Sequence, residues 1–303
     1  MRISSTTGSL AKYYGEEEAI RMLAKAGFDS MDYSMFIHDA ETGIYNTNDF
    51  EAHAKKLKAV ADEAGITFGQ FHAQIPNPSV PDYMSRTELW DKLAKNAIIA
   101  ASIVECPYVV VHPLIMPDRR YDELYKENFD LNLEYYGKMK DTLKKYGVKV
   151  AIENMWHWDD SKNSICPSVC SSAEEMLALA EALGDEFVTC LDVGHAILTD
   201  RTPESMVYIL GDRLATLHVH DNDGKDDTHD IMFNANGINM MFPDPEITIN
   251  WDKFMQSLKD INYKGTFSLE ADNFMKKFPK ELSFDAACFM AKVARHLVDK
   301  YGL

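Results

Sequence analysis

The sequence predicts a (β/α)8 barrel, an α/β fold, on three observations. Short apolar and β-branched segments alternate with longer segments of helical periodicity, a pattern that favours a parallel sheet with helical crossovers. The alternation repeats about eight times over 303 residues, or roughly 38 residues per unit, which suits a barrel with some loop insertions. No linker interrupts the pattern, so we expect residues 1–303 to form one domain.

The elements are predicted in a regular order. The predicted strands are residues 2–5, 30–35, 66–72, 108–112, 148–154, 187–192, 215–220 and 265–270. The clearest helical patterns lie at 49–63, 87–104, 128–146, 172–183 and about 284–301. Gly65, Gly147 and Gly184 follow three of these helices, as is common at helix C-termini. A doubly wound open sheet is the alternative, but Thr7-Gly8-Ser9 after the first strand lacks the glycine-rich phosphate-binding turn of that fold.

One connection is much longer than the others. Residues 222–250 join the seventh and eighth predicted strands and contain Gly224, Gly237, Pro243 and Pro245. Long connections without regular structure are uncommon in compact domains and often serve as active-site lids. We therefore predict that this segment covers a bound substrate.

Composition weighs against several classes of function. There are 31 Lys and Arg against 48 Asp and Glu, a net charge of −17, which repels nucleic acid and acidic membrane surfaces. Five cysteines without a disulfide-like spacing indicate a reducing compartment. The sequence contains neither a signal-peptide pattern nor the ~20 apolar residues of a membrane helix. We expect a cytoplasmic protein, and the charge disfavours a nucleic-acid partner.

Six successive predicted strands, the third to the eighth, end in His, Asp or Glu. In a (β/α)8 barrel the C-terminal ends of the strands and the loops after them build the active site. Buried acids and imidazoles are costly unless paired, and a divalent cation is the natural partner of several that converge. The strand-end residues are His72, His112, Glu153, Asp192 with His195, His218 with His220, and Glu270.

Local spacing supports two of these groups. Asp192 and His195 flank Gly194, whose conformational freedom we expect to let both side chains face the rim of the barrel. His218 and His220 are two residues apart on a strand and are expected to share a face.

Other residues have ordinary explanations. A strand-end histidine such as His72 commonly packs in the core, and Glu153 is also compatible with a salt-bridged barrel acid. His38, His53 and His296 lie away from the predicted strand ends, and we expect no role for them in a site.

The strand-end motifs resemble a known group of proteins. They are Ile152-Glu153-Asn154, Leu191-Asp192-Val193-Gly194-His195, His218-Val219-His220-Asp221-Asn222-Asp223-Gly224 and Ser268-Leu269-Glu270. In order and spacing they are similar to the sugar-phosphate isomerase/epimerase group of the xylose isomerase-like barrel superfamily, along essentially the whole chain. The resemblance implies a divalent metal, Mn²⁺, Zn²⁺ or Co²⁺, held by Glu153, Asp192, His218 and Glu270.

The resemblance also implies a reaction. In ketose 3-epimerases of this group, two glutamates flank the sugar and exchange its proton, which assigns the catalytic roles to Glu153 and Glu270. The expected partner is a small carbohydrate, and relatives often form homo-oligomers. The residues expected to contact substrate or orient the ligands are His72, His112, His195, His220, Trp156, Asp227 and His229.

Three alternatives remain open. Abasic-site nucleases of the endonuclease IV type hold three zinc ions, and their ligands have counterparts here that include the Asp-x-His pair Asp227 and His229. The net charge and the absence of a dense basic cluster weigh against this function, and the residues from Asp230 to Gly237 match neither the nuclease nor the sugar-enzyme pattern. A dehydratase of inositol-type ketones would begin with the same proton abstraction. A barrel without activity would bind no metal.

Overall fold

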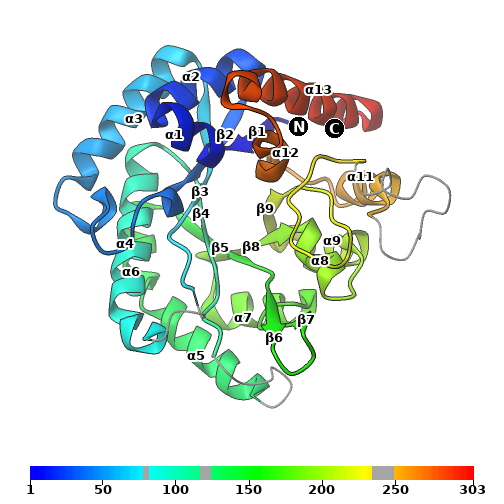
Figure 1. The fold of residues 1–303 in the computed structure, drawn as a ribbon. Helices are drawn as coiled ribbons and strands as arrows, with labels where there is room; N and C mark the ends of the chain where they lie inside the picture. The colour runs from blue at the N-terminus through cyan, green and yellow to red at the C-terminus, as the bar shows by residue number, and fades with distance from the viewer. Residues whose placement is uncertain (78–81, 117–123, 234–248) are drawn as a thin grey trace.

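A closed ring of eight parallel strands forms the centre of the computed structural model, which describes residues 1–77, 82–116, 124–233 and 249–303 (Figure 1). The strand order is β10-β1-β2-β3-β4-β5-β8-β9. Val219 closes the ring: its N–H donates to Ser268 O at 2.8 Å, and its carbonyl accepts from Glu270 N at 3.0 Å. The predicted (β/α)8 barrel is therefore confirmed. The barrel strands are β1 (Ile3–Thr6), β2 (Ser30–Ser34), β3 (Thr67–His72), β4 (Tyr108–Val111), β5 (Lys149–Glu153), β8 (Phe187–Asp192), β9 (Leu214–His218) and β10 (Phe267–Leu269).

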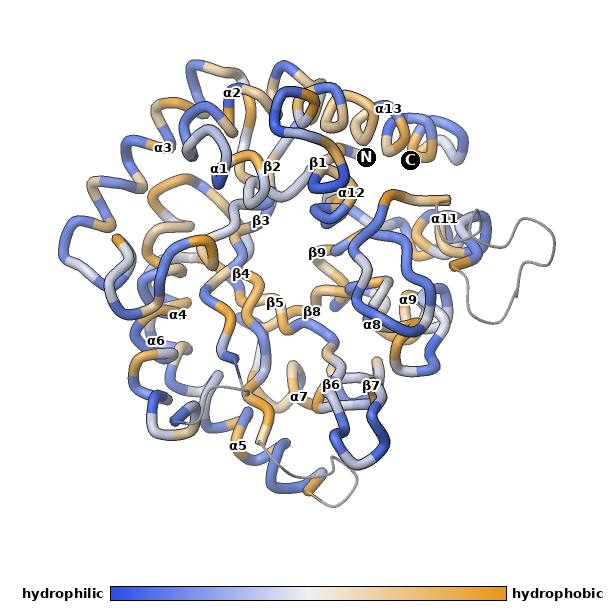
Figure 2. The backbone as a smooth tube through the Cα atoms, in the orientation of Figure 1, coloured by the Kyte–Doolittle hydropathy of each residue, from blue (hydrophilic) through white to orange (hydrophobic). Residues whose placement is uncertain are grey.

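Helices surround the ring and cover its outer face (Figure 1). They bury one side and leave the other hydrophilic, so the two characters alternate along α3 and α13 in Figure 2. The helices are α1 (Gly8–Tyr14), α2 (Glu16–Ala26), α3 (Phe50–Ala64), α4 (Thr87–Ile103), α5 (Tyr125–Gly137), α6 (Lys140–Tyr146), α7 (Ala173–Leu183), α8 (Val193–Leu198), α9 (Pro203–Leu210), α11 (Trp251–Asp260), α12 (Asp272–Lys276) and α13 (Ser283–Tyr301).

Alternate side chains of each strand face either the helices or the inside of the ring. The large apolar cluster lies between the strands and the helices. A second, small cluster of Val110, Ala151, Val188 and Cys190 fills the inside of the ring. Because side chains alternate along a strand, the residues two positions further on also face inward. Glu153, two residues after Ala151, is thereby directed to the interior at the C-terminal end of β5.

Two predicted elements differ in the structure. The helix expected over 128–146 is divided into α5 and α6, because α5 ends at Gly137, a poor helix former, and Met139 N donates to Tyr136 O in a tighter turn. Between the predicted strand 148–154 and the helix 172–183, where no strand is predicted, the chain forms an antiparallel hairpin of β6 (Trp156–Asp159) and β7 (Ser164–Pro167). Asp159 Oδ1 stabilises the turn by accepting hydrogen bonds from two backbone N–H groups.

Two expectations concern other parts of the chain. Residues 234–248 of the segment predicted to cover a substrate lie outside the described residues. Among the described residues, none of the helices combines the length and hydropathy that spanning a bilayer requires.

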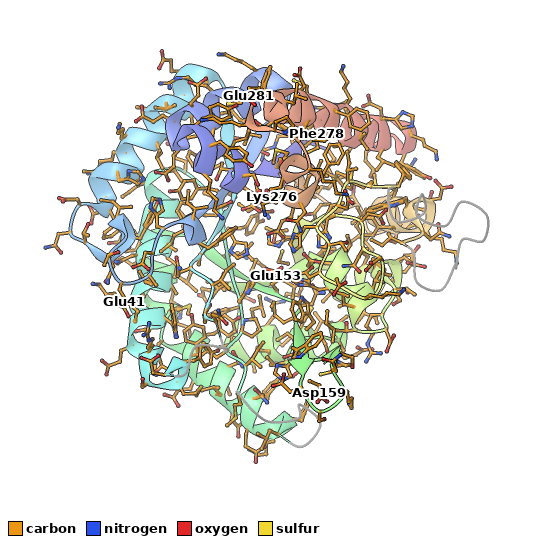
Figure 3. The ribbon with its side chains drawn as sticks, in the orientation of Figure 1. Glu41, Glu153, Asp159, Lys276, Phe278 and Glu281 are labelled. Carbon is orange, nitrogen blue, oxygen red and sulfur yellow. The ribbon has the colours of Figure 1, made fainter. Side chains whose placement is uncertain are left out.

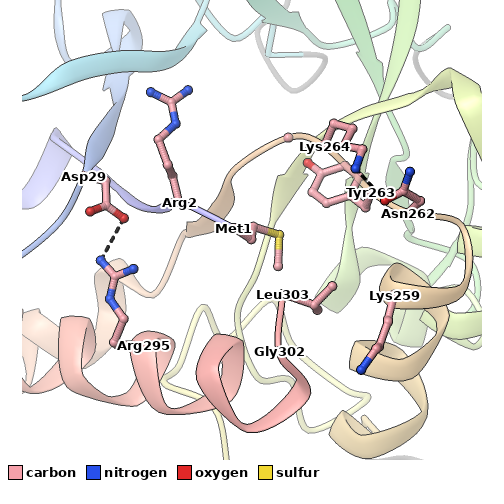
Figure 4. A pocket seen from close by; sticks show the side chains of 11 residues that line it. Met1, Arg2, Asp29, Lys259, Asn262, Tyr263, Lys264, Arg295, Gly302 and Leu303 are labelled. Carbon is pink, nitrogen blue, oxygen red and sulfur yellow. Dashed lines mark hydrogen bonds and ion pairs between the residues drawn. The ribbon is translucent and has the colours of Figure 1, made fainter.

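The end of the barrel opposite the C-terminal strand ends brings the two termini together. Met1 and Leu303 line a cavity of about 750 Å³ there, together with Arg2 and Arg295 (Figure 4). Arg295 Nη2 donates to Asp29 Oδ2 at 2.7 Å, and the same oxygen accepts from Ile3 N at 2.8 Å. These contacts join α13 to β1 and so contribute to the stability of this end of the barrel.

Candidate active site

A cavity of about 870 Å³ opens at the C-terminal ends of the barrel strands. Glu153 lies near the centre of the ring in Figure 3. Asp192, His218 and His220 do not line the cavity; they are fully buried. The predicted site residues that line the cavity are His72, His112, Glu153, Trp156, His195, Asp227, His229 and Glu270.

Glu153 is surrounded by imidazoles although only 1% of its surface is exposed. Its Oε1 lies 2.9 Å from His218 Nδ1, and its Oε2 lies 3.0 Å from His112 Nε2 and 3.5 Å from His72 Nε2. Glu270 reaches the same His218 Nδ1 with Oε2 at 3.1 Å. Two carboxylates from β5 and from the end of β10 thus meet one ring nitrogen.

The other ring nitrogen of His218 faces a residue that the sequence analysis missed. His218 Nε2 lies 3.1 Å from Oδ2 of Asp32, a fully buried residue of β2. Gln70 Nε2 donates to the same oxygen at 2.9 Å and to Leu217 O at 3.2 Å. An acid in the middle of a predicted barrel strand was the available signal. Asp32 was overlooked because it does not lie at a strand end.

Asp227 joins a second group of imidazoles beside the first. Its Oδ2 lies 3.1 Å from His229 Nε2 and 3.4 Å from His195 Nε2, and it accepts a hydrogen bond from Trp156 Nε1 at 3.3 Å. His195 Nδ1 lies 3.7 Å from Glu153 Oε1, so the two groups adjoin. Asp227 and His229 therefore line the same cavity as Glu153.

Four site histidines share one arrangement. Each places Nδ1 against a backbone carbonyl; a carbonyl only accepts, so Nδ1 carries the proton and a neutral ring presents a lone pair at Nε2. In each case Nε2 faces a carboxylate oxygen at 3.1–3.5 Å. Two lone pairs repel unless a proton or a cation lies between them. The carbonyl contacts are His72 to Ala73 O (3.0 Å), His195 to Asn154 O (2.8 Å), His220 to Asp221 O (3.2 Å) and His229 to Glu270 O (2.9 Å).

Asp192 is oriented by its position at the start of α8. Its Oδ1 accepts from His195 N at 2.7 Å, the helix N-cap bond, and lies 3.1 Å from His220 Nε2. Its backbone N–H donates to the side chain of Asn154 at 2.7 Å, which joins β8 to the end of β5. The direct contacts of this carboxylate are therefore with His195 and His220, on the side of the site toward Asp227.

Gly194 has a different role from the expected one. It lies inside α8 and does not have a positive φ, so the conformational freedom that we expected it to supply is not used. A glycine is needed here because no side chain fits: a Cβ at this position would lie 2.0 Å from His220 Cε1. The glycine lets the His220 ring pack against the helix, where it stacks on His229 at 4.2 Å between centroids.

The pKa shifts describe a site that requires positive charge. Burial alone would lower the pKa of His229, but Asp227 raises it to about 10. Burial would likewise raise the pKa of Glu153, yet the neighbouring His218 and His112 hold it well below its usual range. Burial raises the pKa of Glu270, against the opposing effect of His218. Burial also raises the pKa of Cys190, beside His218, to about 12.

The residues present fit a divalent cation. Glu153 Oε2 is buried and makes no hydrogen bond within the described part of the chain. Oxygen atoms of Glu153 and Glu270 lie about as far from His218 Nδ1 as neighbouring ligands lie from each other around a Zn²⁺ or Mn²⁺ ion. Further candidate metal groups combine His72, His112 and Glu153, and His195, Asp227 and His229, with ligand atoms within 4.8 Å of one another.

The fold and site define a (β/α)8 barrel with acids and imidazoles gathered at the strand ends. The chain belongs to the xylose isomerase-like TIM barrel family, whose model matches residues 20–290. An uncharacterised protein of Methanocaldococcus jannaschii is 26% identical over 181 residues, which cover 59% of this chain and 55% of the relative. Another from Sinorhizobium fredii is 26% identical, and the match covers 51% of it. The chain thus spans about half the length of these two curated relatives.

Solved structures resemble the whole fold. A D-tagatose 3-epimerase-like protein matches with a TM-score of 0.74 and 19% identity, covering 100% of this chain and 98% of the other. The D-psicose 3-epimerase of Clostridium cellulolyticum, solved with D-tagatose, matches with a TM-score of 0.70 and 14% identity, covering 98% and 99%. At these identities the likeness shows the fold.

Replacing Gly194 with Ala should destabilise the protein by about 1–3 kcal/mol, because the new methyl group must displace the buried His220 ring. Chemical unfolding measures the change. Gly137→Ala is the matched control, since a Cβ there meets nothing within 4 Å and alanine favours the helix. Equal stability of the Gly194→Ala variant and the wild type would contradict the packing argument.

Replacing Asp32 with Asn should weaken divalent-metal binding by about 10- to 100-fold, because carboxylates behind a metal-binding imidazole orient the ring and raise its basicity. Competition titration with a chromophoric chelator measures the affinity. Asp62→Asn, a change in an exposed carboxylate paired with Lys58, should leave it unaltered. Unchanged affinity in the Asp32→Asn variant would show that Asp32 does not support the site.

Proposed function

We propose that the protein is a divalent-metal-dependent isomerase or epimerase that moves a proton next to the carbonyl of a sugar or sugar derivative. The observation that carries the proposal is the meeting of Glu153 and Glu270 at His218 Nδ1, at the base of a cavity large enough for a sugar. The similar solved structures include a D-tagatose 3-epimerase-like protein and a D-psicose 3-epimerase, which supports this class of substrate.

Glu153, Asp192, His218 and Glu270 are the proposed ligands of the metal. A bound divalent cation would polarise the carbonyl and stabilise the negative charge that develops when the neighbouring proton leaves. Glu153 and Glu270 approach with oxygen atoms 2.9 and 3.1 Å from His218 Nδ1. Asp192, whose carboxylate faces His220 and the N-terminus of α8 in this structure, would turn toward these three residues to join them.

The two glutamates are the proposed acid and base. Glu153 ends β5, and Glu270 follows β10. Two strands separate β5 from β10 on one side of the ring, and four strands separate them on the other side. The two side chains therefore enter the cavity from different walls of the barrel. Both line the cavity. One carboxylate can then remove a proton from one face of the substrate while the other supplies a proton to the opposite face, as epimerisation requires.

Aromatic side chains form the other wall of the cavity. Phe36, Tyr83, Trp156 and Trp158 line it, together with Met155. Flat apolar rings suit the hydrophobic face of a sugar, while the acids and imidazoles face its hydroxyl groups. Trp156 is oriented by its hydrogen bond to Asp227, which makes it the best-positioned stacking residue.

Glu153→Gln and Glu270→Gln should each lower proton exchange by about 100-fold or more, because a carboxamide cannot accept the substrate proton. The protein is incubated in D₂O with Mn²⁺ and, separately, D-fructose, D-tagatose, D-psicose or L-ribulose, and mass spectrometry measures deuterium in the recovered sugar.

Glu134→Gln, an exposed residue of α5, is the control and should exchange at the wild-type rate. Full deuterium incorporation by either active-site variant would refute the assignment of that residue. Exchange without a new sugar would favour a dehydratase or another enzyme that begins with proton abstraction.

A trinuclear phosphodiesterase is the second candidate, and it is favoured by one observation. The groups His72, His112 and Glu153 and His195, Asp227 and His229 adjoin the ligands proposed above. Such a site would assist the hydrolysis of a phosphodiester. The net charge of −17 opposes binding to a DNA backbone, which leaves this function second.

Metal content distinguishes these functions. Protein purified without added metal or chelator should contain about one divalent ion per chain at the cavity if the isomerase proposal holds, because one ion suffices for proton transfer at a carbonyl. Elemental analysis of the wild type and of the double variant His112→Gln/His229→Gln measures it. A loss of two ions in the variant would favour the trinuclear enzyme, and no metal in either protein would favour an inactive barrel.

A further inference from the structure

We propose that Glu16, His38 and His53 form a separate zinc site on the outer side of the barrel. Glu16 is the first residue of α2, His38 follows the turn after β2, and His53 lies in the first turn of α3. None of the three lines the active-site cavity. The sequence analysis assigned no role to the two histidines, because their approach to Glu16 depends on how the helices pack.

The geometry is that of a three-ligand site. Glu16 Oε1 lies 3.0 Å from His38 Nε2, and Oε2 lies 3.1 Å from His53 Nε2. One ligand atom from each of the three residues lies within 4.8 Å of the other two. Neighbouring ligands around a tetrahedral Zn²⁺ lie about 3.3 Å apart at ordinary bond lengths, so only a small adjustment would admit the ion. Two imidazoles and one carboxylate are also a ligand set that zinc enzymes use, with a fourth position left for water.

Hydrogen bonds account for only part of the cluster. Glu16 Oε1 accepts from Tyr33 OH and is also hydrogen-bonded to His38 Nε2 at 3.0 Å. His53 Nε2 is buried and points at Glu16 Oε2, yet it makes no hydrogen bond within the described residues. A ring nitrogen that is buried, directed at a carboxylate and not hydrogen-bonded to it is placed as a metal ligand would be.

The surroundings hold these groups in place and leave their charge unmatched. Tyr45 OH donates to Tyr33 OH at 2.8 Å, and the Tyr45 ring packs edge-on against both histidines. The nearby lysine, Lys56, pairs instead with Glu17. Within the described residues Glu16 pairs with the two imidazoles and with no Lys or Arg, so a divalent cation between them would balance the charge of the carboxylate.

Zinc at this position would stabilise one wall of the active-site cavity. It would link the starts of α2 and α3 to the connection after β2. That connection contains Phe36, which lines the cavity and packs edge-on against His72 at 4.9 Å between centroids. The proposal does not depend on the reaction assigned to the cavity, since it concerns residues outside it.

The test compares zinc content in full-length variants. Wild type, His53→Gln and Glu16→Gln are stripped with chelator, reloaded with ZnCl₂, dialysed and analysed for zinc per chain. We expect each variant to hold one zinc ion fewer than the wild type. His296→Gln removes an exposed imidazole of α13 and should match the wild type. Equal zinc content in wild type, His53→Gln and Glu16→Gln overturns the proposal.

A second measurement uses only the wild type, so it tests the proposal even if the variants fail to fold. Diethylpyrocarbonate modifies free imidazole nitrogens, and mass spectrometry locates the modified residues. Zinc should slow modification of His38 and His53 in proportion to the zinc-free fraction, while exposed His296 reacts at the same rate with and without zinc. Equal reactivity of His38 and His53 in both conditions would leave a hydrogen-bonded cluster as the correct description.

Discussion

The neutralisation of buried carboxylates at the mouth of the barrel is the constraint on which the rest of the structure depends. Glu153, Asp192 and Asp32 are almost completely buried, and each lies against at least one imidazole. Charges removed from water are costly unless they are paired in good geometry. The strands, the α8 N-cap and the space at Gly194 all serve to bring these partners together.

Backbone carbonyls determine which nitrogen of each site histidine carries the proton. By accepting from Nδ1 of four histidines, they fix which ring nitrogen is left to face the carboxylates. His218 is different because both of its nitrogens face acids, Glu153 and Glu270 on one side and Asp32 on the other. This ring therefore connects the buried interior of the barrel to the open cavity.

The same combination of acid and imidazole occurs twice on different sides of the strands. Inside the ring it lies at the cavity where a substrate can enter, whereas Glu16, His38 and His53 lie under the helical layer. Tyr33 and Asp32 are consecutive residues of β2 and point to these two environments, Tyr33 toward Glu16 and Asp32 toward His218. One strand thereby contributes to both groups, because successive side chains alternate between its faces.

The sequence by itself determined the barrel, its strand order and the inward position of residues such as Glu153, His218 and Glu270, since these follow from local periodicity and from the common end of parallel strands. The sequence did not determine which side chains from distant segments contact one another. Asp32 beside His218 depends on ring closure, and Glu16 beside His53 depends on the packing of α2 against α3. Periodicity indicates which face a residue occupies, but only tertiary packing decides which distant side chain it meets there.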